Sequence, residues 1–264
     1  VAQTREEAEL ALANMMQDKV YGEAGNEVVI EECLFGEEMS ILAFVDGETV
    51  VPMVPSQDHK PVFDGDKGPN TGGMGTYSPV PHISQSVVDG AIETILKPAA
   101  KAMVAEGRPF RGILYAGLMI TETGPKTIEF NCRFGDPETQ VVLPRLKTDL
   151  YSILKAVVER KLNEIEIEWN DEAAVCVVLA SGGYPGAYDK GLPIEGLEEV
   201  RESVVFHAGT TFDAEGRTIT DGGRLLGVTA LGQDIAEARS KAYSDVKRIQ
   251  YNGRHYRTDI AEKA

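Results

Sequence analysis

Apolar residues recur every three to four positions in four stretches of the chain, which predicts four amphipathic helices. The first predicted helix follows a capping box at residues 4–7, and the other three cover residues 86–105, 149–162 and 235–249. Pro98 lies inside the second helix and should kink or split it, since proline removes a backbone donor. Asp234 immediately precedes the last helix, where its carboxylate is suited to cap the first turn.

Shorter apolar and β-branched runs predict strands between these helices. The predicted strands are residues 27–33, 40–45, 49–54, 113–120, 127–130, 173–180, 204–207 and 225–230. Asp46-Gly47 is typical of a two-residue hairpin turn, and Thr123-Gly124-Pro125 predicts a second antiparallel pair. Residues 57–81 are polar and rich in Gly and Pro, with little strand or helix pattern.

This order of elements predicts an α+β fold, with a mixed or antiparallel sheet and flanking helices. The pattern changes after the acidic stretch at residues 163–172, where a continuous apolar strand and a Gly/Pro/Tyr loop follow. We therefore expect a domain boundary in this stretch and a smaller α/β domain after it.

Composition and charge narrow the function. The chain has 264 residues, with 42 acidic and 26 basic side chains and a formal charge of −16, which argues against nucleic acid and anionic membranes as partners. A phosphate ligand would need locally gathered Lys, Arg and backbone N–H groups. No apolar run approaches the ~20 residues of a membrane span. Cys33, Cys132 and Cys176 are far apart, which favours free thiols in a reducing cytoplasm.

The strongest candidate chemistry lies on the strand that ends at Asn131. Because side chains alternate along a strand, Glu129 and Asn131 should face one way, while Ile128 and Phe130 should face the core. A carboxylate and an amide oxygen are hard ligands suited to Mg²⁺, and Arg133 follows two residues later with a fork suited to phosphate. On these residues alone, a strand end with polar groups facing solvent remains an alternative.

Two further segments suit a nucleotide and its partners. Gly72, Gly73 and Gly75 allow the backbone to approach a ligand closely, although a structural turn explains them equally well. The predicted strand at residues 27–33 ends in the acidic segment 31–38, where exposed backbone groups could bond the edge of adenine and a carboxylate could bind the ribose hydroxyls. A solvated edge strand is the alternative. No Ser-His-Asp or Cys-His pattern indicates a covalent nucleophile.

Together and in this order, these features resemble the ATP-grasp ligases, and among them the family of phosphoribosylamine–glycine ligases (glycinamide ribonucleotide synthetases). The resemblance covers essentially the whole chain. It is carried by RFGDPETQ at residues 133–140, QDHK at 57–60, GPNTGGMGTYSP at 68–79, YAGLMI at 115–120 and GGRLLGVTALG at 222–232.

The resemblance implies a role for each matching residue. Glu129 and Asn131 match the metal-binding pair, and Arg133 matches an arginine directed at phosphate. The segment that receives adenine corresponds to Glu31, Glu32, Cys33 and Leu34, with Glu38 as the ribose-binding acid. The catalytic residues correspond to Arg133, Asp58 and Lys60. The substrate site corresponds to Asn70, Thr71, Gly72, Gly73, Met74 and Gly75, with Arg224 as a weaker candidate.

The family also implies an activity. It would use ATP and Mg²⁺ or Mn²⁺ to join glycine to 5-phosphoribosylamine through glycyl phosphate, in the cytoplasm and without nucleic acid or membrane partners. The implied domains are a remnant of the ATP-grasp lid subdomain at residues 1–29, the ATP-grasp core at 30–165 and a C-terminal domain at 166–264. The alternatives are an ATP-grasp ligase for another acid or ribotide, and a nucleotide-binding module without catalysis.

The chain departs from the family's pattern in two places. The family's N-terminal domain, and its flexible glycine-rich loop with a phosphate-gripping lysine, have no counterpart before Val1, so we expect this chain to correspond to about the C-terminal two-thirds. Many ATP-grasp enzymes also carry a metal-binding carboxylate twelve residues before the Glu of the metal pair. Here that position is Gly117.

Overall fold

The computed structural model describes residues 1–2 and 4–264, which form two compact units, Val1–Gly36 and Glu37–Ala264. The described residues have the predicted α+β character, with antiparallel sheets and packed helices. Within this part of the chain, no helix has the length and apolar character needed to cross a bilayer.

The first unit begins with helix α1 (Arg5–Leu12). The Thr4 hydroxyl accepts a hydrogen bond from the Glu7 N–H at 3.2 Å. This bond confirms Thr4 as the N-cap residue of the predicted capping box. A π-helical turn at Ala13–Gln17 and a 3₁₀ turn at Gly22–Asn26 follow.

The strand predicted at residues 27–33 is wrong, since this segment forms no strand. Val29 and Ile30, which made the segment look like a strand, are 86% and 79% exposed. A β-strand needs a neighbour to receive its backbone hydrogen bonds, and no strand lies among the described residues of this unit. The strand propensity of residues 27–33 is therefore not enough to form a strand without a partner.

The second unit contains a four-stranded antiparallel sheet in the order β2-β1-β7-β8. Its strands are β1 (Glu37–Asp46), β2 (Thr49–Pro52), β7 (Arg111–Thr121) and β8 (Gly124–Asn131). Both predicted antiparallel pairs are confirmed, but their turns are residues 47–48 and 122–123, since Asp46, Gly124 and Pro125 lie in the strands. Asp46 pairs with Thr49, so Gly47 and Glu48 form the first turn, and the positive φ of +62° at Gly47 explains the glycine there.

Helices cover both faces of this sheet. α2 (Gln85–Ala91) and α3 (Lys97–Ala105) are joined by a π-helical turn at Ile92–Leu96, so the predicted helix is interrupted just before Pro98. They pack on the face that carries Ile41. The opposite face packs against α5 (Leu150–Glu159), whose N-terminus is capped by the Asp149 carboxylate.

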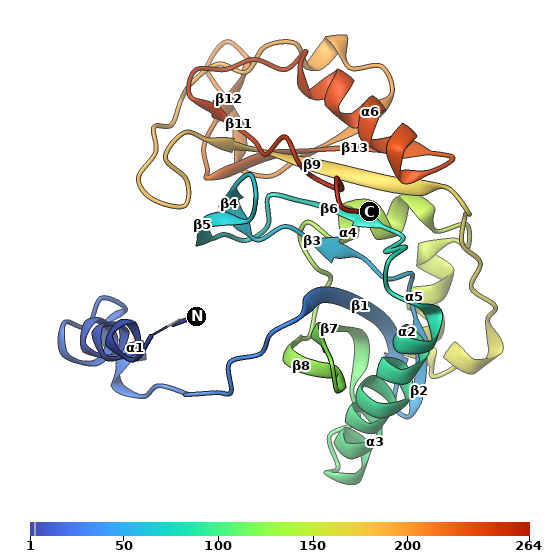
Figure 1. Cartoon of the computed structure of the whole chain (residues 1–264). Coiled ribbons are helices and arrows are strands. Elements are labelled where there is room, and N and C mark those ends of the chain that lie inside the picture. Colours follow the sequence, from blue (N-terminus) through green and yellow to red (C-terminus); the bar gives the residue numbers. More distant parts are fainter. Residues whose placement is uncertain (3) are drawn as a thin grey trace. The chain divides into compact units, whose positions relative to one another are not determined.

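A second sheet runs in the order β10-β13-β9-β6-β3, and β14 also pairs with β9. Its strands are β3 (Gln57–Asp58), β6 (Gly75–Ser78), β9 (Ala173–Ser181), β10 (Ser203–His207), β13 (Arg224–Gly232) and β14 (Arg254–His255). Helix α6 (Ile235–Val246) packs along β9 and β13 (Figure 1). The Asp234 carboxylate accepts from the Glu237 N–H at 2.8 Å, which confirms the predicted cap.

The expectation that residues 57–81 lack regular structure is wrong. They contain β3 and β6 and the small hairpin of β4 (Pro61–Phe63) and β5 (Lys67–Asn70). β6 is buried because its residues pair with β9, with Thr76 opposite Cys176. The remaining short elements are α4 (Thr139–Val142), β11 (Thr210–Phe212) and β12 (Thr218–Thr220).

A buried arginine ties the β4–β5 hairpin to the C-terminal segment. The Arg257 side chain is 1% exposed and donates to both carboxylate oxygens of Asp259 at 2.7 Å and to Asp66 at 2.8 Å. Burial raises the pKa of Asp259, but the hydrogen bonds from Arg257 and the Gly65 N–H outweigh burial and hold it below its usual range. The segment before the candidate substrate loop is thereby fixed to the end of the chain.

Arg257→Ala should destabilise the protein by about 3–5 kcal/mol, because it leaves partly buried carboxylates without their cation. Urea denaturation at neutral pH measures the change. Arg217→Ala is the matched control, since Arg217 also pairs with two carboxylates, those of Asp213 and Glu215, but its side chain is 63% exposed. The control should leave the midpoint near that of the wild type, and equal losses from both variants would contradict the role of burial.

Candidate functional site

Glu129 and Asn131 lie together at the end of β8. The Asn131 amide donates from Nδ2 to Glu129 Oε1 at 3.0 Å, so the two side chains share one side, as the alternation predicted. The expectation that Phe130 faces the core is wrong, because it is 42% exposed. β8 is an edge strand with a bulge: Thr127 pairs with Leu118 and Glu129 with Gly117, which leaves Ile128 as an extra residue that breaks the alternation.

Glu129 and Asn131 suit Mg²⁺ better than a metal ion whose ligands all come from the protein. In the part of the chain that the structure describes, no group of three or more His, Cys, Asp or Glu side chains could hold a metal ion. The amide hydrogen bond leaves Asn131 Oδ1 and one carboxylate oxygen of Glu129 for a cation. Mg²⁺ commonly takes one or two such ligands and completes its shell with water and phosphate oxygens. The donor set therefore fits the implied metal.

Gly117 lies directly opposite Glu129 in the sheet. A Cβ atom on Gly117 would lie 3.4 Å from Tyr115 Cε1 and 3.5 Å from Glu129 Cγ, which is ordinary contact. A longer side chain would meet the Tyr115 ring. The Tyr115 ring thus lies next to position 117, where many ATP-grasp enzymes carry another metal-binding carboxylate.

The glycine-rich loop at residues 70–75 lies against Asp58. Thr71 donates from its N–H and its hydroxyl to the Lys60 carbonyl at 2.9 and 2.7 Å, and Gly73 N–H donates to the Thr71 hydroxyl at 3.0 Å. Gly73 has a φ of +113°, and a Cβ there would lie 2.7 Å from Asp58 Oδ1 and 2.4 Å from Pro137 Cδ. Both backbone conformation and crowding therefore require glycine at this position.

Asp58 is surrounded by charges of both signs. Burial raises the pKa of Asp58 well above its usual value, and the negative charge of Glu138 raises it further, while Lys60 and Arg224 oppose them. Its Oδ1 atom is buried and has no hydrogen-bond partner among residues 1–2 and 4–264. A buried carboxylate oxygen without a donor is costly, so this atom is suited to bind an incoming N–H group.

Lys60 connects this acid to two other predicted residues. Its Nζ pairs with Glu38 Oε2 at 2.6 Å. Burial lowers the pKa of Lys60, but the hydrogen bond and charge of Glu38, with the charges of Asp58 and Glu129, outweigh burial and raise it. The structure therefore gathers residues predicted separately for catalysis, ribose binding and metal binding around one ammonium group.

Arg224 holds the glycine loop in place. Its Nη1 donates to the Gly72 carbonyl at 2.7 Å and the Asp136 carbonyl at 3.0 Å, and lies 3.2 Å from Asp136 Oδ1. Its Nε and Nη2 donate to no atom in the described ranges 1–2 and 4–264. One side of the guanidinium thus positions the loop, while the other remains for a ligand.

The other predicted residues are Arg133 and four residues of the first unit. Arg133 is exposed beyond β8, where its Nη1 donates to the Phe134 carbonyl at 2.8 Å. Glu31, Glu32, Cys33 and Leu34 belong to the first unit, and Cys33 is an exposed free cysteine. Cys132 and Cys176 are also free, as predicted from their spacing.

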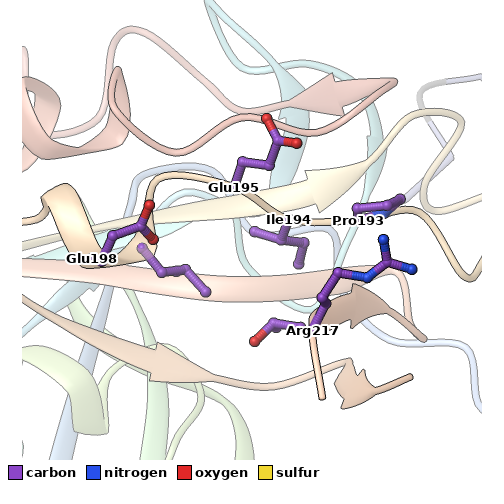
Figure 2. Close-up of a pocket in the computed structure, with 7 residues that line it drawn as sticks. Pro193, Ile194, Glu195, Glu198 and Arg217 are labelled. Atoms are coloured by element: carbon purple, nitrogen blue, oxygen red, sulfur yellow. The ribbon is translucent and has the colours of Figure 1, made fainter. Parts of the chain in front are cut away.

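A separate pocket lies near β12, and Figure 2 shows the side chains of Glu195, Glu198 and Arg217 around it. None of the predicted site residues lines it. The Arg217 guanidinium is already paired with Asp213 and Glu215, so this pocket adds no group to the chemistry described above.

Sequence reasoning missed a buried polar group beside the site, formed by Ser40, Tyr115 and Glu138. In the sequence, Ser40 lies in a predicted apolar strand, Tyr115 in another and in the segment YAGLMI, and Glu138 in RFGDPETQ as one of the carboxylates after the metal pair. A hydroxyl residue inside an otherwise apolar strand is the signal that could have identified Ser40, since buried polar groups need partners.

The fold and site define an ATP-grasp protein. The family model described as "Phosphoribosylglycinamide synthetase, ATP-grasp (A) domain" matches residues 1–139, and the model for the family's C domain matches residues 174–263. The chain belongs to the phosphoribosylglycinamide synthetase family.

Individual relatives agree with this assignment. A phosphoribosylamine–glycine ligase of Caldanaerobacter subterraneus is 51% identical over 255 residues, which cover 97% of this chain and 61% of that protein. The crystal structure of the Thermotoga maritima phosphoribosylamine–glycine ligase has a TM-score of 0.82 and 35% identity, covering 97% of this chain and 64% of that one. The chain thus spans about 61% of the length of the curated relatives it matches first.

The fold also resembles that of more distant proteins. A biotin carboxylase domain of Hydrogenobacter thermophilus, solved with MgADP and bicarbonate, has a TM-score of 0.69 at 13% identity and covers 98% of this chain and 59% of that chain. This likeness concerns the fold alone.

Proposed function

We propose that the protein containing this chain is an ATP-dependent ligase that joins glycine to 5-phosphoribosylamine through glycyl phosphate. The observation that carries the proposal is the charge cluster of Asp58, Lys60 and Glu38, which lies under the glycine loop and whose lysine also feels the charge of Glu129. Membership of the phosphoribosylglycinamide synthetase family supports the choice of substrates. The three free cysteines fit a reducing cytoplasm as its location.

The proposed reaction needs charge neutralisation more than a covalent nucleophile. A carboxylate oxygen of glycine forms a bond to the γ-phosphorus of ATP and ADP leaves; the amine then attacks the carbonyl carbon and phosphate leaves. Glu129 and Asn131 would hold Mg²⁺, which when bound neutralises the charge of the phosphates. Lys60 contributes a second positive charge, and Arg133 supplies an exposed guanidinium for a phosphate oxygen.

Asp58 and the loop above it suit an amino acid without a side chain. The Asp58 Oδ1 atom lacks a donor, and the ammonium group of glycine can supply one. The free edge of Arg224 suits an anionic oxygen on the other side of Gly72. Since there is no room for a Cβ atom between Gly73 and Asp58, the space beside this carboxylate is narrow, which suits an amino acid without a side chain.

The nucleotide assignments extend the same proposal. Glu31, Glu32, Cys33 and Leu34 would receive adenine. Glu38 would bind the ribose hydroxyls through Oε1, because its Oε2 atom already pairs with Lys60. The ribose acid and the catalytic lysine would then be coupled, so that nucleotide binding and Lys60 position depend on each other.

The test measures ADP release by the full product of the gene that encodes this chain. Glycine and 5-phosphoribosylamine, the latter generated in situ from ammonia and ribose 5-phosphate, should both be required for rapid release. A different acid or ribotide that gives faster release would assign another ATP-grasp ligase. Binding of Mg-ATP without release under any pair would assign a nucleotide-binding module without catalysis.

A further inference from the structure

Glu138 is a buried carboxylate that the proposed reaction does not use. Its side chain is 4% exposed, and its Oε1 atom accepts from the Tyr115 hydroxyl at 2.9 Å and from the Ser40 hydroxyl at 3.2 Å. The two hydroxyl oxygens are 2.8 Å apart. Burial and then the charge of Glu138 raise the pKa of Tyr115, which therefore remains a donor to the carboxylate.

The two hydroxyls belong to Ser40 and Tyr115, which are aligned across the sheet with the proposed metal pair. Ser40 on β1 pairs with Gly117 on β7, and Gly117 pairs with Glu129 on β8. Tyr115 pairs with Asn131. Glu138 is thus hydrogen-bonded to the strands that place both metal-binding candidates.

The segment that carries Glu138 also contacts the glycine loop. A Cβ atom on Gly135 would lie 2.4 Å from Glu138 Oε2, so the carboxylate packs tightly against the turn that follows Arg133. Pro137, the residue before Glu138, and Asp58 both lie against Gly73, since a Cβ atom there would come within 2.4 Å of Pro137 Cδ and 2.7 Å of Asp58 Oδ1. The negative charge of Glu138 also raises the pKa of Asp58.

We propose that Glu138 is a positioning residue: anchored by Tyr115 and Ser40 to the metal-binding strands, it sets the charge that Asp58 presents to the amino group of the substrate. The charged groups that face Asp58 are Glu138 from the start of α4, Lys60 beside it, Arg224 from β13 and Glu38 from β1. Of the two negative groups, Glu138 is buried, whereas the Glu38 side chain is 39% exposed. This assignment rests on the proposed function for the identity of the amine.

The test is the pH profile of kcat/KM for glycine in Glu138→Gln, which keeps the size of the side chain and an oxygen acceptor for Tyr115. Asp58 must be ionised to hold an ammonium group, so activity falls as the pH drops through its pKa. Glu138 raises that pKa, and its neutralisation should move the acid limb to lower pH. The control Glu122→Gln, at the exposed β7–β8 turn, should leave the limb in place.

The outcomes are separable. An active wild type with an unmoved acid limb in Glu138→Gln overturns the role of Glu138, whereas a wild type without glycine-dependent turnover overturns the proposed function. A carbon-13 titration of the Asp58 carboxyl in the full gene product, without substrates, should show the same downward shift, and an unchanged titration overturns the inference independently of activity.

A second variant covers the case in which Glu138→Gln does not fold. Tyr115→Phe removes only the hydroxyl that anchors the carboxylate. It should lower kcat/KM for glycine about tenfold, the effect of one lost hydrogen bond to a charged group, with KM for ATP unchanged. Equal losses for both substrates, or none, would show that the tyrosine acts only in packing and overturn the inference.

Discussion

Glu129→Gln is expected to lower kcat by about 10²–10³-fold while the protein stays folded, since it removes the one negative charge of the proposed metal pair. Glutamine keeps the length of the side chain and can still accept the hydrogen bond from Asn131. Glu129 is exposed at a sheet edge, so the substitution buries no new polar group. Steady-state ADP release by the full gene product, over a series of Mg²⁺ concentrations, measures the effect.

Glu122→Gln provides the matched control, because Glu122 lies on the exposed turn of the same hairpin. It makes the same chemical change and should leave kcat and the Mg²⁺ dependence near those of the wild type. If Glu129→Gln also kept a near-normal rate, or if both variants lost activity equally, the assignment of the metal to this strand would be wrong.

Gly73→Ala is expected to lower kcat/KM for glycine by about 100-fold, equivalent to about 2–3 kcal/mol of lost binding and backbone strain. An added Cβ would lie 2.7 Å from Asp58 Oδ1 and 2.4 Å from Pro137 Cδ, and the φ of +113° strains any other residue. The loop must then move away from the acid that it covers. Glycine titration at saturating ATP measures the loss.

The control for this variant separates strain from contact. Gly124→Ala imposes nearly the same φ, +108°, at a turn where a Cβ would meet no atom within 4 Å. It should cost some thermal stability but leave kcat/KM for glycine unchanged. Equal losses in the two variants would indicate general backbone strain and would contradict a specific contact between the loop and Asp58.

Elements with local signals could be predicted from the sequence. The capping residues Thr4 and Asp234 accept the expected backbone hydrogen bonds, and the helix with Pro98 is interrupted where proline requires it. The hairpin turn at Gly47 also formed as expected, because the positive φ it needs is carried by the residue itself. In each case the cause lies within a few residues of the effect.

Elements that depend on distant partners could not be predicted. β6 is a strand because β9, about 100 residues later in the chain, supplies its hydrogen bonds, and a Gly/Pro-rich sequence gives no sign of that partner. Residues 27–33 have the apolar pattern of a strand, but the described residues of their unit contain no strand to pair with them. The exposure of Phe130 depends on a bulge set by pairing with β7.

The same division holds for the candidate site. The shared side of Glu129 and Asn131 follows from strand alternation over two residues, so it was predictable. The pairing of Lys60 with Glu38, and the anchoring of Glu138 by Ser40, join segments that only the folded chain brings together. The family resemblance identified several of these residues, but it did not indicate their contacts.

The fate of the glycine oxygen atoms tests the proposed reaction most directly. If a glycine carboxylate oxygen attacks ATP and the amine later displaces phosphate, that oxygen leaves with the phosphate. With glycine carrying oxygen-18 in both carboxylate positions, phosphorus-31 NMR of the full gene product's reaction should show one oxygen-18 atom in each phosphate released. Release of phosphate without the label, at the same rate of product formation, would contradict glycyl phosphate as the intermediate.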